Sequence, residues 1–218
     1  MPTLGYIVTL VIAYLLGSIP TGFLVAKARG VDIRAVGSGN IGATNVFRIL
    51  GRTAGILVLL VDAAKGWLAV SVVASWVGGW THASPTAGVW MALVAGVAAI
   101  LGHNYTCWLH FKGGKGIATS AGVLVALVPA ALLIVLGIWI VVFAVSRYVS
   151  LASICAALAL PFAAWLHHES RTIIIVTFAL AALAIYKHKA NIKRLMNGTE
   201  NRIGTKKAAP PNSPKATA

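Results

Sequence analysis

The chain has 218 residues, of which 59% are hydrophobic and only 10% are charged, and its mean hydropathy is +0.87. This composition excludes an ordinary soluble globular domain. Lysine and arginine together number 18, against 4 acidic residues. Because the basic residues lie between apolar stretches and towards the C-terminal end, they indicate orientation in a membrane and anionic partners rather than nucleic acid. We therefore expect an all-α polytopic integral membrane protein, with residues 1–204 as one transmembrane domain and residues 205–218 as a disordered basic tail.

Long apolar stretches predict the membrane-spanning helices in chain order. The first predicted span covers residues 4–26, and Gly17 and Pro20 predict a kink in its second half. The sixth span is expected to start near Ser150, with this serine as its N-cap. The remaining predicted spans outside residues 117–145 cover residues 54–77, 88–101 and 172–186.

The apolar run Ile117–Val145 is interrupted by Pro129 and allows two interpretations. As one helix it would be about 44 Å long, against a hydrocarbon core of about 30 Å. As two helices that turn at Pro129, each half is short, but the chain then crosses the membrane seven times and all its basic segments share one side. The positive-inside rule favours this second topology, with the N-terminus outside and the C-terminus in the cytoplasm.

The least apolar part of the first half is Val36–Arg48, which reads VGSGNIGATNVFR. Its glycines let backbone amides approach a ligand closely. Arg48 adds a planar set of donors that fits phosphate or carboxylate. At the end of a membrane span this combination predicts an anion site, while the alternative is a glycine-rich connecting loop with incidental polarity. The short hydrogen-bonding side chains in the motif are those of Ser38, Asn40, Thr44 and Asn45.

A second polar segment, Phe111–Gly116, reads FKGGKG. It is not a Walker A motif, because the pattern GxxxxGK[ST] requires serine or threonine directly after the lysine, where this chain has Gly116. Its amides and lysines are nevertheless expected to form a nest for an anion, the alternative being a tight turn whose lysines fix the topology. The expected contacts are the amides around Gly113, Gly114 and Gly116 and the ammonium groups of Lys112 and Lys115. His103 precedes this segment and is the histidine of this region that we consider for the site.

Asp62 and Lys65 lie three residues apart in a predicted span, so their side chains can meet on one helix face. A lone charge near the bilayer centre costs about 2.5–3.5 kcal/mol on insertion scales, so pairing or contact with water is expected. Two interpretations are open: a structural ion pair, or the wall of a polar groove.

The seven-span topology brings all the polar motifs to the cytoplasmic face. Ser150 and Ser153 begin the sixth span, and His188 and Asn191 share one helical face if the last helix continues beyond the membrane. Cationic and donor groups of this kind suit a substrate that carries phosphate. Cysteine, histidine and acidic residues lack the spacing of metal ligands, so we expect neither a metal nor a cofactor. A small anion transporter is the competing class, but it predicts polar residues through the middle of several helices, and only Asp62 and Lys65 fit that pattern.

The sequence contains neither a His-x4-Asp pair nor a GxSxG motif. An acyl-transfer enzyme without these groups would use an already activated donor and would act by positioning two substrates and stabilising charge.

Four segments carry a family resemblance: GSGNIGATNVFR, GHNYTCWLHFKGGKGIATS, SRYVSLAS and HKANIKRLMNGTENRIG. In this order they resemble the motifs of the bacterial acyl-phosphate:glycerol-3-phosphate acyltransferase family, known as PlsY. The resemblance implies seven transmembrane helices with an outside N-terminus, in agreement with the charge argument. It also implies transfer of a fatty acyl group from acyl phosphate to the 1-position of glycerol 3-phosphate. The products would be lysophosphatidic acid and phosphate, in the first acylation step of phospholipid synthesis.

The resemblance further implies a location in the bacterial cell membrane with the active site on the cytoplasmic side. The expected partners are the two substrates and the lipid bilayer, without nucleic acid, and the expected assembly is a monomer. The family's essential positions map to Ser38, Arg48, Lys115, His188 and Asn191. Its further substrate contacts map to Asn40, Asn45, Gly113, Gly114, Gly116, Ser150, Ser153 and Glu200, beside the candidates Lys112 and His103. Ile41 departs from the family pattern, because a proline is common there.

These residues give a mechanistic hypothesis. Ser38, Lys115 and neighbouring amides would hold the phosphate of the acyl donor, while Arg48, His188 and Asn191 would hold the phosphate of glycerol 3-phosphate. The acyl chain would lie in a groove that opens toward lipid. The attacking hydroxyl would lose its proton to His188, to the phosphate of the donor or to water, and the sequence leaves these three alternatives open.

Overall fold

The computed structural model describes residues 2–204, and the predicted tail at residues 205–218 lies outside the described residues. The described part is helical and contains no strand. The helices of the first half are α1 (Pro2–Ser18), α2 (Thr21–Lys27), α3 (Ala43–Leu50), α4 (Arg52–Leu68), α5 (Ser75–Trp80) and α6 (Pro85–Asn104). Those of the second half are α7 (Ile117–Leu127), α8 (Pro129–Ser146), α9 (Val149–Leu166), α10 (Arg171–Lys187) and α11 (Lys189–Met196). A π-helical stretch, Ala69–Ala74, joins α4 to α5, and a 3₁₀ turn, Cys107–Leu109, follows α6.

Length and composition identify helical segments that can cross a membrane. Five segments qualify on their own, and a sixth qualifies if α10 and α11, which are bent by 58° with respect to each other, are taken as one. The five are Thr3–Lys27, Arg52–Trp80, Pro85–Leu109, Pro129–Ser146 and Val149–Leu166. The remaining apolar helix, α7, has only 11 residues. The expectation of an all-α protein with several apolar helices of spanning length is therefore confirmed.

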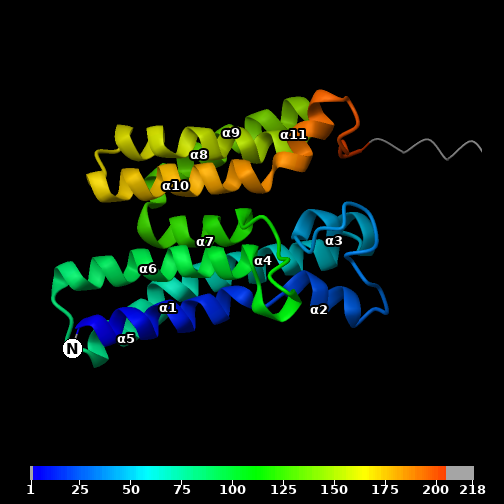
Figure 1. Cartoon of the computed structure of the whole chain (residues 1–218). Helices are drawn as coiled ribbons and strands as arrows, with labels where there is room; N and C mark the ends of the chain where they lie inside the picture. Colours follow the sequence, from blue (N-terminus) through cyan, green and yellow to red (C-terminus); the bar gives the residue numbers. More distant parts are fainter. Residues whose placement is uncertain (1, 205–218) are drawn as a thin grey trace, which may run out of the picture.

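The helices form two groups that lie side by side in Figure 1. Helices α1, α4, α6 and α7 pack together, and α8, α9 and α10 form the second group. Leu180 and Leu183 of α10 pack against a buried cluster of Val70, Ile100 and Val123 in the first group, which holds the two groups together. Burial of such apolar side chains excludes both water and lipid from the contact.

Prolines set the helix boundaries that the sequence predicted. Helix α1 ends at Ser18 and α2 begins at Thr21, on the two sides of Pro20, so the predicted kink is a complete break. Helix α7 ends at Leu127 and α8 begins at Pro129, which confirms two helices in the long apolar run. Proline produces both breaks because it lacks the N–H that would continue the helical hydrogen bonds.

The predicted start of the sixth span near Ser150 is confirmed, but the predicted N-cap is wrong. Helix α9 begins at Val149, and its N-cap is Tyr148 rather than Ser150. Ser150 lies inside the first turn, where its hydroxyl donates to the carboxylate of Glu200 at 3.0 Å instead of capping its own helix. The hydroxyl of Ser150 therefore bonds to Glu200, 50 residues away in the sequence, and not to the backbone of its own helix as a cap would.

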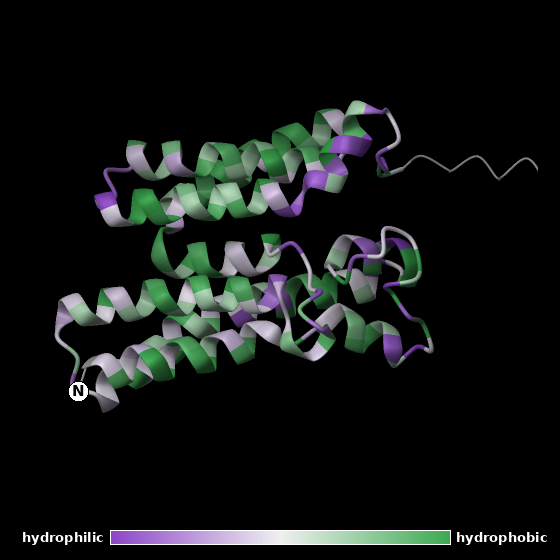
Figure 2. Ribbon diagram, in the orientation of Figure 1, coloured by the Kyte–Doolittle hydropathy of each residue, from purple (hydrophilic) through white to green (hydrophobic). Residues whose placement is uncertain are grey.

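The polar motifs are gathered at one end of the molecule. Figure 1 shows α2, α3, α11 and the beginning of α7 at this end, while the N-terminus and the link between α5 and α6 lie at the opposite end. In Figure 2 the long helices are largely hydrophobic, and hydrophilic residues concentrate at the two ends. The fold thus brings together segments from both halves of the chain at the end where the basic motifs lie.

Candidate active site

A cavity of about 360 Å³ begins at the polar end and extends between the two groups of helices. It is lined by the loop before α3, by α3 and α4, and by residues from α6 to α11. All the predicted site residues line it except Lys112, Gly113 and Gly114. The residues it brings together are Ser38, Asn40, Asn45, Arg48, His103, Lys115, Gly116, Ser150, Ser153, His188, Asn191 and Glu200. The structure therefore assembles in one cavity groups that lie far apart in the sequence.

Asn45 organises the loop that carries Ser38. Its buried amide nitrogen donates to the carbonyl oxygens of Val36 at 3.1 Å and Asn40 at 2.9 Å, and lies 3.2 Å from that of Ile33. Its oxygen accepts the backbone N–H of Ser38 at 2.9 Å. Because both ends of this side chain are used within the protein, Asn45 shapes the loop, and the exposed side chain of Ser38 is left at the cavity.

The side chain of Asn40 also acts within the loop, because its oxygen accepts the N–H of Gly42 at 2.8 Å. Gly42 is the residue before α3, so this bond fixes the start of that helix. One turn into α3, the half-buried guanidinium of Arg48 lines the cavity and donates to the carbonyl of Asn201 at 3.3 Å. Arg48 therefore connects the first polar motif with the segment that follows α11.

A chain of hydrogen bonds links the lysine–glycine loop to α11. The ammonium of Lys115 donates to the amide oxygen of Asn191 at 2.5 Å, and the amide nitrogen of Asn191 donates to Glu200 at 2.8 Å. The pKa of Lys115 is lowered to about 8, chiefly by burial; Glu200 opposes this shift, and the nearby cations Arg194, Arg48 and Lys187 contribute to it. The ammonium is thus a cation that changes its charge near neutral pH.

Glu200 is buried and accepts from three side chains. Ser150 and Asn191 donate to one oxygen of its carboxylate, and Arg194 donates to the other at 2.7 Å. Burial by itself would raise the pKa of Glu200, but the hydrogen bonds from Asn191, Arg194 and Ser150 outweigh it and hold this pKa below its ordinary value. Glu200 is therefore an ionised anchor that joins α9 to α11.

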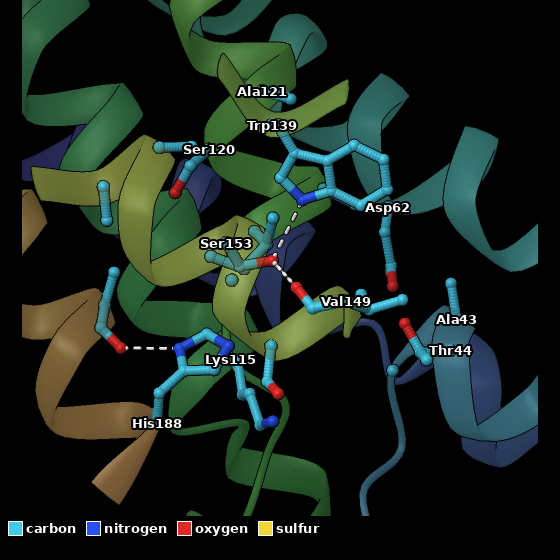
Figure 3. A pocket seen from close by; sticks show the side chains of 18 of the residues that line it. Ala43, Thr44, Asp62, Lys115, Ser120, Ala121, Trp139, Val149, Ser153 and His188 are labelled. Atoms are coloured by element: carbon cyan, nitrogen blue, oxygen red, sulfur yellow. Dashed lines mark hydrogen bonds between the residues drawn. The ribbon is translucent and has the colours of Figure 1, made fainter. Parts of the chain in front are cut away.

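His188 occupies the bend between α10 and α11 and is buried. Its Nδ1 lies 2.8 Å from the carbonyl oxygen of Ala184, which can only accept a hydrogen bond. Hydrogen-bond counting therefore assigns a proton to Nδ1 and leaves Nε2 for other partners. Figure 3 shows the imidazole of His188 beside the side chain of Lys115 at the cavity.

Ser153 and Trp139 mark where the cavity becomes apolar. The hydroxyl of Ser153 donates to the carbonyl of Val149 at 2.9 Å and accepts from the indole N–H of Trp139 at 3.2 Å, as Figure 3 shows. Beyond this pair the lining consists largely of aliphatic side chains from α7 to α10, namely Leu124, Leu132, Val135, Leu136, Ala156, Ala157, Leu160, Leu180 and Ala181. The cavity therefore has a polar end and an apolar end.

The lysine–glycine loop differs from the nest that the sequence predicted. The amides of Gly113 and Gly114 donate to the carbonyls of Asn104 and His103 at 3.2 and 3.0 Å, so they are engaged within the protein. Lys112 is exposed and lies outside the cavity. The close packing of this loop against the end of α6 turns the two amides inward, a contact that local sequence does not reveal. Gly116 differs, because it lines the cavity with a positive φ of 80° as the N-cap of α7.

The first residues of α7 add to the polar end. Ile117 and Ala118 line the cavity, and they belong to the first turn of this helix. The N–H groups of a first helical turn have no partner within the helix and carry partial positive charge. They therefore favour an anion beside Lys115.

Two lining residues with hydrogen-bonding side chains were not predicted from the sequence. Trp139 lies in a long apolar run, where a tryptophan gives no signal of a site, and Ser120 follows the second motif without a distinctive pattern. Asp62, for which two interpretations were open, is both paired with Lys65 at 2.8 Å and part of the cavity wall. Within residues 2–204 no cluster of three or more histidine, cysteine or acidic side chains could hold a metal ion.

Comparison with known proteins gives one consistent result. The family model for glycerol-3-phosphate acyltransferase matches residues 7–198. Glycerol-3-phosphate acyltransferases of Geotalea daltonii and Geobacter sulfurreducens are each 49% identical to this chain, over 89% and 92% of it and over 96% and 98% of their own lengths.

Solved structures agree with these relatives. The crystal structure of PlsY, an integral membrane glycerol 3-phosphate acyltransferase, in its glycerol 3-phosphate form superposes with a TM-score of 0.82 at 40% identity. Its lysophosphatidic acid form gives a TM-score of 0.79 at 38% identity, and both comparisons cover 92% of this chain and 96% of the other. The chain belongs to the glycerol-3-phosphate acyltransferase family and is an integral membrane enzyme.

Proposed function

We propose that this enzyme transfers a fatty acyl group from acyl phosphate to the 1-position of glycerol 3-phosphate, giving lysophosphatidic acid and inorganic phosphate. The observation that carries the proposal is the two-part cavity. Its polar end holds Arg48, Lys115 and His188, which suit phosphate, and its apolar end suits an acyl chain. The reacting carbonyl would lie between them, near Ser153 and Trp139.

The polar end serves both phosphate groups in this proposal. Ser38, Lys115 and the first turn of α7 hold the phosphate of the donor, while Arg48, His188 and Asn191 hold that of the acceptor. The bond between Lys115 and Asn191 supports neighbouring positions for the two phosphates in one cavity. Placing two reactants side by side in this way lowers the barrier by removing translational and rotational freedom before the reaction.

The chemical step is an acyl transfer between two oxygens. The hydroxyl oxygen of glycerol 3-phosphate attacks the acyl carbonyl carbon, the bond from that carbon to the phosphate oxygen breaks, and phosphate leaves. Asp62 is ion-paired with Lys65, and Glu200 accepts hydrogen bonds from three side chains, so the proposal assigns the role of base to neither carboxylate. In this proposal the proton goes to Nε2 of His188, to the phosphate of the donor or to water. Lys115 and the first turn of α7 stabilise the charge of the leaving group.

We further propose seven membrane crossings, in which α7 is a short crossing. The N-terminus would then face outside, and the polar end of the cavity would face the cytoplasm of a bacterial cell. The basic segments around α2, α3, the loop before α7 and α11 lie at one end of the molecule in Figure 1, which supports this orientation, because cytoplasmic segments carry an excess of lysine and arginine. A monomer is sufficient in this proposal, since one chain supplies every group named above.

The experiment uses the purified protein in detergent with palmitoyl phosphate and glycerol 3-phosphate, and it measures phosphate and lysophosphatidic acid together. We expect one phosphate for each lysophosphatidic acid formed. Palmitoyl coenzyme A in place of palmitoyl phosphate should give no product, since its thioester lacks the phosphate that Ser38 and Lys115 are proposed to bind. Equal rates with both donors would contradict the proposed donor, and no product with either would contradict the proposed function.

A further inference from the structure

Asp62, Lys65 and His103 form a buried ion cluster for which the proposed reaction has no use. Their side chains are only 3%, 4% and 5% exposed. Asp62 and Lys65 belong to α4 and His103 to α6, both within segments of spanning length. Burying charged groups in such segments costs free energy, and the groups found there commonly have a function. We therefore expect this cluster to have one.

Lys65 is the centre of the cluster. Its ammonium lies 2.8 Å from the carboxylate of Asp62, 3.0 Å from the carbonyl of Ile19 and 2.8 Å from Nδ1 of His103. The contacts with Ile19 and His103 are hydrogen bonds, and the contact with Asp62 is an ion pair. Nδ1 of His103 is then an acceptor, and the proton of its neutral ring lies on Nε2. Two hydrogen bonds therefore hold the ammonium of Lys65 in place, and the carboxylate of Asp62 balances its charge.

The cluster joins three parts of the fold. The carbonyl of Ile19 lies at the break between α1 and α2, directly before Pro20, and Lys65 provides it with a donor from α4. His103 adds the end of α6. A second bond strengthens this junction, because the hydroxyl of Thr106 donates to the carbonyl of Ser18 at 2.6 Å.

His103 in turn holds the loop that carries Lys115. Its backbone carbonyl accepts the N–H of Gly114, and a Cβ on Gly114 would collide with Nε2 of its ring. On the other side of Lys115, α7 crosses α4 closely, because Gly66 faces the carbonyl of Thr119 with no room for a Cβ. Gly66 follows Lys65 in the chain. The loop is therefore attached to one turn of α4 on both sides of Lys115, through His103 to Lys65 and through α7 to Gly66.

We propose that Asp62, Lys65 and His103 are positioning residues that hold the Lys115 loop at the phosphate end of the cavity. This inference rests on the proposed function, in which Lys115 binds the phosphate of the donor. The cluster acts through the loop and does not touch the reacting atoms. A purely structural ion pair would affect stability and leave the kinetics of the folded enzyme unchanged, which makes the two roles separable.

The test is a double-mutant cycle on the steady-state kinetics of the full-length enzyme. Asp62→Asn with Lys65→Met removes both charges together and so avoids a single unpaired charge in the membrane. We expect KM for palmitoyl phosphate to rise about tenfold, with a much smaller change in kcat, because a displaced Lys115 weakens binding. Adding Lys115→Ala should raise KM no further than Lys115→Ala alone, since coupled residues are not additive.

Asp32 and Arg34 provide a matched control, because they form an exposed ion pair outside the cavity at 2.9 Å. Asp32→Asn with Arg34→Gln should keep both KM and kcat. If the Asp62–Lys65 variant does not fold, His103→Gln replaces it, because this change leaves the ion pair intact and should give the same rise in KM and the same lack of additivity with Lys115→Ala.

Two results would overturn the inference: a folded cluster variant with unchanged KM, or effects that add to those of Lys115→Ala. An unchanged KM in Lys115→Ala itself would instead contradict the proposed role of Lys115. Failure of the inference and failure of the proposed function can therefore be distinguished.

Discussion

Lys115 and Asn191 are 76 positions apart in the sequence, yet the ammonium of Lys115 donates to the amide oxygen of Asn191 at 2.5 Å. This bond joins the loop before α7 to α11 at the polar end of the cavity. Because Asn191 also donates to Glu200, the position of Lys115 depends on the segment that follows α11.

The two lysines of the FKGGKG segment are expected to differ in function. Lys115→Ala removes a charge-assisted contact with phosphate and should raise KM for palmitoyl phosphate about 10- to 100-fold. Lys112→Ala should have a far smaller effect, because Lys112 is exposed and lies outside the cavity. Steady-state kinetics of both variants measure the difference. Equal effects would mean that charge anywhere in the segment is sufficient.

The activity should fall as Lys115 loses its proton. Its pKa is lowered to about 8, so the side chain is charged below that pH and neutral above it. We therefore expect kcat/KM for palmitoyl phosphate to decline above about pH 8, because kcat/KM reports the ionisation of the free enzyme. In Lys115→Arg the decline of kcat/KM should move to a pH above the range in which the enzyme can be assayed, since arginine stays protonated. A decline that stays at the same pH in this variant would assign it to another group.

Glu200→Gln should destabilise the protein and weaken activity together. The substitution removes the negative charge that accepts from Arg194, Ser150 and Asn191, and leaves a buried network partly unsatisfied. We expect a loss of about 1–3 kcal/mol in the free energy of unfolding, measured by thermal unfolding in detergent, and a higher KM. Glu169→Gln is the control, because Glu169 lies outside the cavity, 4.0 Å from the exposed His167. Equal stability of the two variants would contradict the anchoring role of Glu200.

Two glycine-to-alanine substitutions should have opposite effects. In Gly113→Ala the new Cβ would collide with the carbonyl oxygen of His103, whereas in Gly137→Ala it would meet nothing within 4 Å. Gly113→Ala should therefore displace the loop and reduce both folded yield and activity. Gly137→Ala lies within α8, where alanine favours the helix by up to about 1 kcal/mol, and should keep full activity. Wild-type kinetics in Gly113→Ala would show that the loop tolerates movement.

The apolar end should set the preferred length of the acyl chain. Ala157 is buried in α9 and lines this end, so Ala157→Phe would fill part of it. If the new ring displaces two methylene groups of the palmitoyl chain, the cost is about 1.6 kcal/mol, which lowers kcat/KM for palmitoyl phosphate about tenfold. The kcat/KM for octanoyl phosphate should change little. Leu158→Phe adds an aromatic ring on the exposed side of the same helix and should leave the ratio of kcat/KM for palmitoyl phosphate to that for octanoyl phosphate unchanged. An unchanged ratio in Ala157→Phe would place the acyl chain elsewhere.

The sequence by itself determined the class of fold and the groups that form the site. Hydropathy predicted the apolar helices, Pro20 and Pro129 predicted two breaks, and the residue types of the motifs predicted a cavity for anions. These features are readable because they depend on local composition, on proline's missing N–H and on the known geometry of guanidinium and ammonium groups.

Only the tertiary structure decided how the groups are used. It engages the amides of Gly113 and Gly114 with the end of α6 and commits Ser150 to Glu200. It also shows that Lys65 reaches α6 and the break at Ile19 as well as Asp62. The contacts of Ser150 with Glu200 and of Lys65 with Ile19 and His103 join segments 38 to 50 residues apart, so their geometry follows from the packing of whole helices and no local pattern encodes it.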